Sequence, residues 1–383
     1  MSGKRSIFEE VGEDRESAKD APRQTGMIDK ARRGVRGAIR AWLIVLFVMV
    51  AVMILVGGLT RLTDSGLSIT EWKPIAGALP PMDEAGWSAA FEKYRAIPEY
   101  QLQNKGMSLA EFKSIYWWEW GHRQLGRGIG LVWGLGFLAF WLTRRIPAGW
   151  TGRLLGIGAL GGLQGAIGWW MVSSGLSGGM LDVASYRLAT HLGIAFVILG
   201  LIAWFVFQLG RPESELMQAR RGRDVRLFGL STGLMHLAFL QVLLGALVAG
   251  IDAGRNFTDW PLMAGGFLPP DLFALDPWWR NFFEDDGLVQ FMHRMTGYLL
   301  FVFGLLVWGR ARQSGNRHTR RAFDWLAAML LGQMVLGIVT VMHSSPWNIA
   351  ILHQLGAVVL WVLILRARFR AQYPIAQSVR GAA

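Results

Sequence analysis

Four histidines in strongly apolar surroundings are the residues of this chain whose type and spacing could do chemistry. His122, His191, His293 and His353 each lie near the start of an apolar stretch that is long enough to cross a membrane. Two imidazoles that come from different helices at similar depth can bind one metal ion from opposite sides. The four histidines therefore predict two bis-imidazole metal sites, and the iron of a heme suits that geometry.

The ligand types available in the chain favour heme over other metal centres. The 383 residues include no cysteine, which excludes disulfides, thiolate metal sites, iron–sulfur clusters and cysteine nucleophiles. A closed zinc site needs a third or fourth ligand, and copper usually recruits methionine or cysteine. One histidine alone is more typical of an interfacial or hydrogen-bonded residue, but the same pair in both halves of the chain indicates axial ligation.

A carboxylate beside the first histidine suggests that one of the two sites is catalytic. Glu119 precedes His122 by three residues, so a helix places both side chains on one face. The corresponding residue before His293 is Gln290. This difference predicts that Glu119, His122 and His191 carry the chemistry and that the other pair holds a resident cofactor. The alternative is that Glu119 only caps a helix or pairs with the arginine four residues later.

Basic residues close to the histidines are candidates for binding heme propionates. Arg123 and Arg294 directly follow two of the histidines, and Arg61 lies at the end of an earlier apolar stretch. Lys73 and Arg127 are further candidates by charge and expected depth. Each of these residues could equally be an interfacial cation whose charged end reaches water.

Other polar residues in the apolar stretches have simpler interpretations. Gln164, Gln241 and Gln333 each precede a glycine by four residues, which indicates hydrogen bonding and close packing between helices. His236 and His343 are weaker ligand candidates, because neither belongs to the repeated pair. We expect His236 to be an internal hydrogen-bond donor, and His343 could stand near a heme edge.

The elements that position these residues are eight apolar stretches, each about as long as a membrane-spanning helix. They lie near residues 38–59, 122–143, 153–172, 188–209, 227–250, 289–309, 322–342 and 348–366. Hydrophobic residues make up 52% of the chain and charged residues only 17%, which is typical of an integral membrane protein. The expected fold is therefore all-α, with eight transmembrane helices in a lipid bilayer.

The distribution of positive charge predicts the orientation of these helices. Arginines and lysines cluster before the first apolar stretch, in every second connection and after the last stretch. Both termini should then be cytoplasmic, and all four histidines should lie toward the outer, periplasmic face of an inner membrane. The formal net charge of +12 is explained by this topology, so nucleic-acid binding is not expected.

The chain contains an internal repeat of two four-helix units. The pair His-Arg at residues 122–123 recurs at residues 293–294. The two long outer connections also share a motif, which reads TEW at residues 70–72 and TDW at residues 258–260. Matching residues in matching order indicate two fused, parallel bundles.

Three regions follow from the repeat and the charge pattern. Residues 1–36 should be a disordered cytoplasmic tail, because they are polar and mixed in charge. Residues 37–212 should form the N-terminal four-helix bundle, and residues 213–383 a pseudo-symmetric C-terminal bundle. Small residues on the helix faces would also permit a homo-oligomer.

Two motifs resemble the signatures of the heme A synthase family. They are GGLTRLTDSGLS at residues 57–68, which is followed by WKP at residues 72–74, and YWWEWGHR at residues 116–123. The resemblance extends from about residue 38 to residue 370 and is closest to the mitochondrial and proteobacterial branch. Another branch carries a cysteine pair in its first outer connection, and this chain has none.

The resemblance implies an oxidoreductase that oxidises the C8 methyl of heme O to a formyl group by successive hydroxylation, giving heme A for cytochrome c oxidase. His122 and His191 would flank heme O, with Glu119 as a catalytic carboxylate. His293 and His353 would bind a permanent heme b. Partners would include heme O synthase and an electron-transfer protein.

Bis-histidine ligation leaves no open position on an iron that must activate oxygen. Either one histidine leaves during turnover, or the methyl group is oxidised by electron removal with water as the oxygen source. Two alternatives to the enzyme also stay open, a quinone-linked di-heme b electron carrier and a heme transporter.

Overall fold

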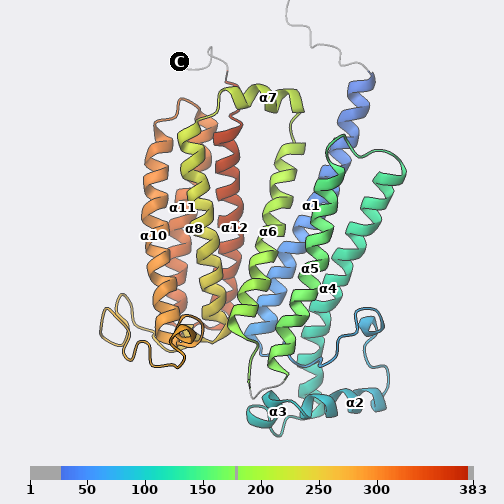
Figure 1. The fold of residues 1–383 in the computed structure, drawn as a ribbon, viewed down its shortest axis with the longest axis vertical. Coiled ribbons are helices and arrows are strands. Elements are labelled where there is room, and N and C mark those ends of the chain that lie inside the picture. Colours follow the sequence, from blue (N-terminus) through green and yellow to red (C-terminus); the bar gives the residue numbers. More distant parts are fainter. Residues whose placement is uncertain (1–26, 177–179, 378–383) are drawn as a thin grey trace, which may run out of the picture.

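The computed structural model describes residues 27–176 and 180–377, and this part of the chain is entirely helical, without strands. Long helices alternate with connections that contain short helices (Figure 1). In chain order the helices are α1 (Met27–Leu62), η1 (Ala76–Ala78), α2 (Glu84–Arg95), α3 (Pro98–Leu102), α4 (Leu109–Leu142), α5 (Thr151–Gly175), α6 (Ser185–Leu209), α7 (Glu213–Arg221), α8 (Val225–Gly250), η2 (Ala253–Arg255), η3 (Trp278–Arg280), α9 (Asn281–Glu284), α10 (Asp286–Arg312), α11 (Arg317–Met342) and α12 (Trp347–Gln372). The expected all-α class is confirmed.

Eight of these helices are long and apolar enough to cross a membrane, as the hydrophobicity of the sequence predicts. They are α1, α4, α5, α6, α8, α10, α11 and α12, and the shortest of them have 25 residues. At about 1.5 Å per residue such a helix is longer than the ~30 Å hydrocarbon layer of a bilayer. The chain is therefore a multi-pass membrane protein.

The eight long helices form two closed groups of four. In the first group α1 packs against α4, α4 against α5, α5 against α6, and α6 against α1. In the second group α8, α10, α11 and α12 pack around in the same order. The groups meet along α1 and α6 of the first and α8 and α12 of the second (Figure 1). The same neighbours in both groups are what two pseudo-symmetric bundles require.

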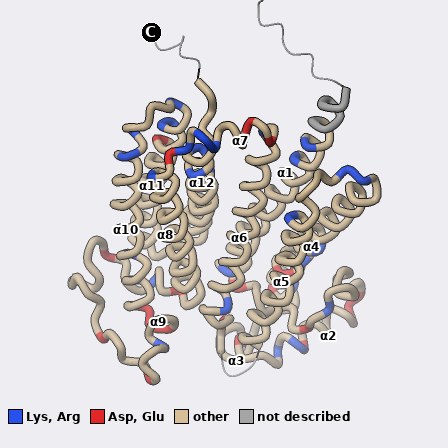
Figure 2. Tube along the Cα trace, turned by 45° about the horizontal axis from the view of Figure 1, so that its top comes forward, with Lys and Arg blue, Asp and Glu red and all other residues tan. Residues whose placement is uncertain are grey.

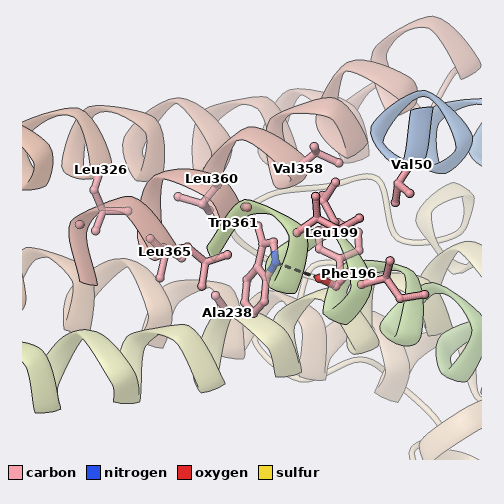
Figure 3. Packing of buried hydrophobic residues seen from close by; sticks show 14 of the residues in the cluster. Val50, Phe196, Leu199, Ala238, Leu326, Val358, Leu360, Trp361 and Leu365 are labelled. Atoms are coloured by element: carbon pink, nitrogen blue, oxygen red, sulfur yellow. Dashed lines mark hydrogen bonds between the residues drawn. The ribbon is translucent and has the colours of Figure 1, made fainter. Parts of the chain in front are cut away.

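Buried apolar side chains fill the boundary between the two groups. Trp361 of α12 donates a hydrogen bond from its indole Nε1 to the backbone carbonyl of Phe196 in α6, at 3.0 Å (Figure 3). Gly200 makes this approach possible, because a Cβ at this position would lie 2.9 Å from that indole nitrogen. Leu199 and Leu365 are buried beside them. Small residues on one helix and large ones on the next allow the close packing that holds membrane helices together.

α4 begins much earlier than hydrophobicity alone predicts. Its start at Leu109 is set by a capping box, in which the Ser108 hydroxyl accepts from the Glu111 amide and the Glu111 carboxylate accepts from Ser108. His122 therefore lies several turns inside α4. The expected start of this helix near residue 122 was wrong, because polar capping and not apolar length decides where the helix begins.

The extension of α4 carries an aromatic cluster outside the apolar spans. Tyr116 and Phe112 of α4 pack against Trp87 and Tyr94 of α2, with ring centres 5.0 Å apart for Trp87 and Tyr116 and 5.3 Å apart for Tyr94 and Phe112. Tyr116 is buried, although its sequence context is also typical of an aromatic belt at a membrane interface. The cluster attaches the first long connection, residues 63–108, to α4.

The two ends of the bundle differ in charge and in structure. The start of α1, the end of α12 and the short helix α7 lie at one end, and α2 and α3 lie at the other (Figure 1). Figure 2 shows lysines and arginines gathered around α7 and the neighbouring helix ends. We call the end with the two long connections, residues 63–108 and 251–285, the loop face.

The N-terminal tail is only partly within the described residues. α1 already begins at Met27, inside the segment 1–36 that we expected to be disordered. A helix can continue beyond its apolar part because lysine and arginine are good helix formers. The expectation of disorder for residues 1–26 lies outside the described residues.

Candidate active site and cofactor site

His293 of α10 and His353 of α12 face each other within the second group of helices. Their ring centres are 6.5 Å apart and their planes are inclined by 82°. A metal–imidazole bond is about 2 Å long, so two imidazoles on opposite sides of one metal ion have ring centres about 6 Å apart. The observed separation fits one metal ion between the two rings.

In the first group of helices, His122 of α4 lies beside Gly57 of α1, and His191 of α6 lies beside Gly168 of α5. All four histidine side chains are half-buried. Each predicted pair therefore consists of two histidines on different helices of one bundle.

A glycine on a neighbouring helix lies behind each of the four imidazole rings. A Cβ at Gly57 would lie 3.2 Å from the His122 ring, and one at Gly168 would lie 2.8 Å from the ring of His191. In the second group the corresponding distances are 3.0 Å from Gly245 to His293 and 2.9 Å from Gly337 to His353. Glycine is needed at these positions because any side chain would be too close to the ring and would displace it.

Three glutamines connect the histidine-bearing helices to their neighbours. Gln164, Gln241 and Gln333 each donate from the amide nitrogen to the backbone carbonyl of a histidine, at 3.0, 3.0 and 2.8 Å. The acceptors are His191, His293 and His353 respectively. The expected interhelical hydrogen bonding is confirmed, and its place beside the histidines shows that it serves these sites.

The residues present fit a heme in each half. In the second half two imidazoles face one another, and in both halves a glycine lies beside each histidine ring on apolar helices. Among residues 27–176 and 180–377 no group of three or more histidines and carboxylates converges as a metal site of another type would require.

Glu119 is buried and accepts hydrogen bonds at both carboxylate oxygens. Oε2 accepts from the Ser68 hydroxyl and from the backbone N–H of Ile69, both at 2.7 Å. Oε1 accepts from Nε and Nη2 of Arg123, at 3.0 and 2.6 Å. The pairing with Arg123 that we considered as an alternative role is thus present. The same contacts also hold the carboxylate in one position, one helical turn from His122.

Arg123 and Arg294 bind the backbone of the long connections. Arg123 donates from Nη2 to the carbonyl of Ile69 and from Nη1 to that of Glu71, at 2.7 and 3.1 Å. Arg294 donates to the carbonyls of Phe257 and Asp259, at 2.7 and 3.0 Å. Each arginine therefore attaches a long connection to the helix that carries the preceding histidine.

Arg61 forms ion pairs that bridge the two halves. Its guanidinium lies 2.9 Å from Asp64, 3.3 Å from Asp182 and 3.1 Å from Asp252. Asp252 follows α8, whereas the other two carboxylates belong to connections of the first half. Nε of Arg61 is buried and has no hydrogen-bond partner in the described part of the chain.

The remaining predicted cations and histidines form bonds with groups other than the four imidazoles. Arg127 donates to the backbone carbonyls of Lys73 and Pro74, and the Lys73 ammonium pairs with a glutamate. His236 and His343 are exposed, and each bonds through Nδ1 to a carbonyl of its own helix. Both histidines therefore have a local structural explanation.

Several partners in these contacts were not singled out from the sequence. Ser68 lies within the motif at residues 57–68, but its hydroxyl gave no reason to connect it with a carboxylate 51 residues later. Glu99 of α3 is buried beside Tyr94, and burial raises the pKa of Glu99 to about 8, with a further contribution from Asp182. No local pattern marks Glu99 as unusual.

The sequence is similar to known proteins along almost its whole length. A family model described as cytochrome oxidase assembly protein, COX15-CtaA, matches residues 40–365. The chain belongs to the COX15-CtaA family of heme A synthases. The heme A synthase of Dinoroseobacter shibae is 68% identical over 383 residues, and that of Ruegeria pomeroyi is 66% identical over 383 residues, with complete coverage of both chains in each case. The heme A synthase of Paracoccus denitrificans is 60% identical over 378 residues, which is 99% of each chain.

Membership of the heme A synthase family confirms the resemblance that the two motifs indicate. It also makes this chain a heme protein and an oxidoreductase of cytochrome oxidase assembly. The match includes α4 and α10, the helices that carry the His-Arg pairs. The whole sequence contains no cysteine.

Proposed function

We propose that the N-terminal half, residues 37–212, oxidises heme O to heme A and that the C-terminal half, residues 213–383, holds heme b. His122 and His191 flank the heme O substrate in this assignment. His293 and His353 are the axial ligands of heme b. The reaction converts the C8 methyl of heme O to a formyl group and supplies heme A for cytochrome c oxidase.

The observation that carries this assignment is the difference between Glu119 and Gln290. Both residues lie three positions before a histidine, on equivalent helices and at 3% exposure. Glu119 can take up and release a proton, whereas the amide of Gln290 cannot. Gln290 instead donates to the backbone carbonyl of Ala253 at 2.7 Å. A protein in which both hemes have the same role would not need a carboxylate at one of these positions and an amide at the other.

Glu119 is the residue to which we assign proton exchange with the substrate. Arg123, Ser68 and the Ile69 amide fix the carboxylate, so it does not reorganise during the reaction. Arg123 uses most of its donors on Glu119 and the connection, which makes it a positioning residue for this edge of the site.

Two other arginines are proposed to bind heme propionates. Nε of Arg294 and Nε of Arg61 are buried without a partner among the described residues, so each retains a donor for an anion. Heme b, when bound, supplies a one-electron redox centre. The substrate side would receive or deliver electrons through it, with an electron-transfer partner and heme O synthase as further partners.

The proposed location is the inner membrane, with cytoplasmic termini and heme sites toward the periplasm. The positive charge gathered at the end opposite the loop face supports this orientation (Figure 2). The small-residue faces of the helices would allow a homo-oligomer in the same membrane.

Extraction of pigment from the purified protein tests the proposal. With heme O synthase co-expressed, chromatography should show heme b together with heme O or heme A. The His293→Ala variant should lose heme b and retain substrate heme. Heme b alone, in every preparation, would favour the electron carrier, and heme O that exchanges without oxidation would favour the transporter.

A further inference from the structure

Three of the four histidines are held by a glutamine, and the fourth is not. Each glutamine amide nitrogen that donates to a histidine carbonyl also lies close to the imidazole ring of the same histidine. The distance to a ring nitrogen is 3.4 Å at His191, 3.1 Å at His293 and 3.2 Å at His353. Within the described residues, His122 has no side-chain hydrogen bond of this kind. All four histidines have a glycine beside the ring, which meets Cε1 in three sites and Nε2 at His122, and His122 alone lacks the glutamine contact in the described part of the chain.

Met53 occupies the place that a glutamine occupies in the other half. Met53 lies four positions before Gly57, and Gln241 lies four positions before Gly245, so each precedes the glycine behind a histidine ring by one helical turn. Both side chains also reach the same point of the facing helix, one turn after the histidine. A Cβ at Gly126 would lie 3.1 Å from Met53 Cε, and one at the equivalent glycine of α10, Gly297, would lie 3.1 Å from the Gln241 amide. At this position the first half therefore has a methionine thioether where the second half has a glutamine amide.

This exchange changes what restrains the histidine. A hydrogen-bonded partner next to a ligand fixes the orientation of the ring and strengthens its hold on the metal. A thioether forms only weak hydrogen bonds, and the flexible methionine side chain adapts to several neighbouring conformations. The His122 imidazole lies beside Gly57 and has no side-chain hydrogen bond within the described residues, so its rotation away from the iron breaks none.

We propose that His122 is the displaceable ligand of the substrate heme and that Met53 is the positioning residue that makes it so. His191, which Gln164 holds, would stay bound while His122 swings away to open one face of the iron. The three glutamine-held histidines are permanent ligands by the same argument. This inference rests on the proposed function, because it takes His122 and His191 as the residues that flank heme O.

Carbon monoxide binding to the reduced, full-length protein tests the proposal directly. Ferrous heme binds this probe only at an open or readily opened position, and the Soret difference spectrum counts the hemes that bind. In the wild type about half of the total heme should react. The Met53→Gln variant should react about tenfold more slowly, in line with the usual effect of a partner residue on a metal ligand. Equal rates in the two proteins, at equal heme content, would overturn the proposal.

Two further variants separate the missing donor from a change of packing. Met53→Leu keeps an apolar side chain and should react like the wild type. Gln241→Met is the reverse exchange and should raise the reactive fraction above half, because it loosens His293. If Met53→Gln failed to load heme, the result with Gln241→Met would decide, and an unchanged fraction there would contradict the proposal.

Pigment analysis of histidine variants identifies which ligand leaves. His122→Ala should retain heme O on His191, and His191→Ala should lose it. The opposite pattern would assign the mobile position to His191 and refute our inference. A preparation that contained heme b in both halves would refute the proposed function instead, and the carbon monoxide comparison would still measure whether Met53 loosens His122.

Discussion

Arg123 and Arg294, at equivalent positions of the two halves, donate hydrogen bonds to corresponding carbonyls of the two long connections. The acceptors of Arg123 lie at residues 69 and 71, and two acceptors of Arg294 lie at residues 257 and 259. In both halves the arginine directly follows a histidine of a proposed heme site. In both halves of the repeat, hydrogen bonds therefore join a long connection to the helix that carries the histidine.

Replacing Arg294 by lysine should loosen the second connection. Lysine lacks the planar fork of donors that reaches two carbonyls. Hydrogen bonds worth roughly 1–3 kcal/mol are therefore lost from the state in which the connection is attached to α10. Trypsin should cut at Arg280 about tenfold faster, which gel analysis of the fragments measures. Arg145→Lys, in a short connection of the other half, is the matched control and should leave this cleavage unchanged. Equal cleavage of Arg294→Lys and wild type would show that the connection is held by other contacts.

Gly337→Ala should remove heme b from the protein. The new methyl group would lie 2.9 Å from Cε1 of His353, so the ring must shift from the position in which it faces His293. We expect the heme b content to fall at least several-fold, measured by the pyridine hemochrome spectrum. Gly332→Ala in the same helix is the control, because a Cβ there has no neighbour within 4 Å. Normal heme b in Gly337→Ala would mean that the ring can shift without losing the iron.

Glu119→Gln should retain both hemes and stop the formation of heme A. The amide fills the same space but cannot exchange a proton, and it replaces one acceptor oxygen that faces Arg123 or Ser68. Chromatography of extracted pigment should then show heme O in place of heme A. Ser68→Ala removes a single hydrogen bond to the carboxylate and should only slow the reaction. Unchanged heme A production by Glu119→Gln would remove the carboxylate from the mechanism.

Glu99 should make the stability of the first connection depend on pH. Burial raises the pKa of Glu99 from an ordinary value of 4.5 to about 8, so the folded connection binds a proton more tightly than the unfolded one. The stabilisation from this proton is complete below pH 4.5 and is lost as the pH rises to about 8. Thermal unfolding of the wild type should therefore occur at lower temperature at pH 9 than at pH 6.

The Glu99→Gln variant is the test of that assignment. Glutamine stays neutral, so its unfolding temperature should change less between these two pH values. Glu111→Gln serves as the control, because Glu111 is exposed and lies in the same region. If Glu99→Gln and the wild type showed the same pH dependence, another group would be responsible for it.

The apolar spans and the pairing of the histidines were accessible from the sequence because both depend on short-range patterns. About twenty apolar residues form a membrane helix in almost any context. Equivalent depth on alternate helices then brings His293 and His353 together. The start of α4 was missed because the capping box at Ser108 and Glu111 lies outside the apolar stretch and adds several polar turns to the helix.

The partners of the charged residues could not be derived in the same way. Arg61, Arg123 and Arg294 were expected to face heme propionates, and the structure places most of their donors on carboxylates and loop carbonyls. The choice depends on where the two long connections of the loop face return to the helices, which hydrophobicity and spacing do not encode. For the same reason, the contacts of Glu99 and Ser68 could be identified only from the tertiary structure.

The sequence by itself determined the eight helices, the two related halves and the four histidines, because hydrophobicity, repetition and residue type are written along the chain. Only the tertiary structure decided that glutamines contact three of the histidines and that Met53 occupies the position where a glutamine for His122 would lie. A hydrogen bond between helices depends on the register and distance of residues that are far apart in sequence. That register is set by the packing of all eight helices together.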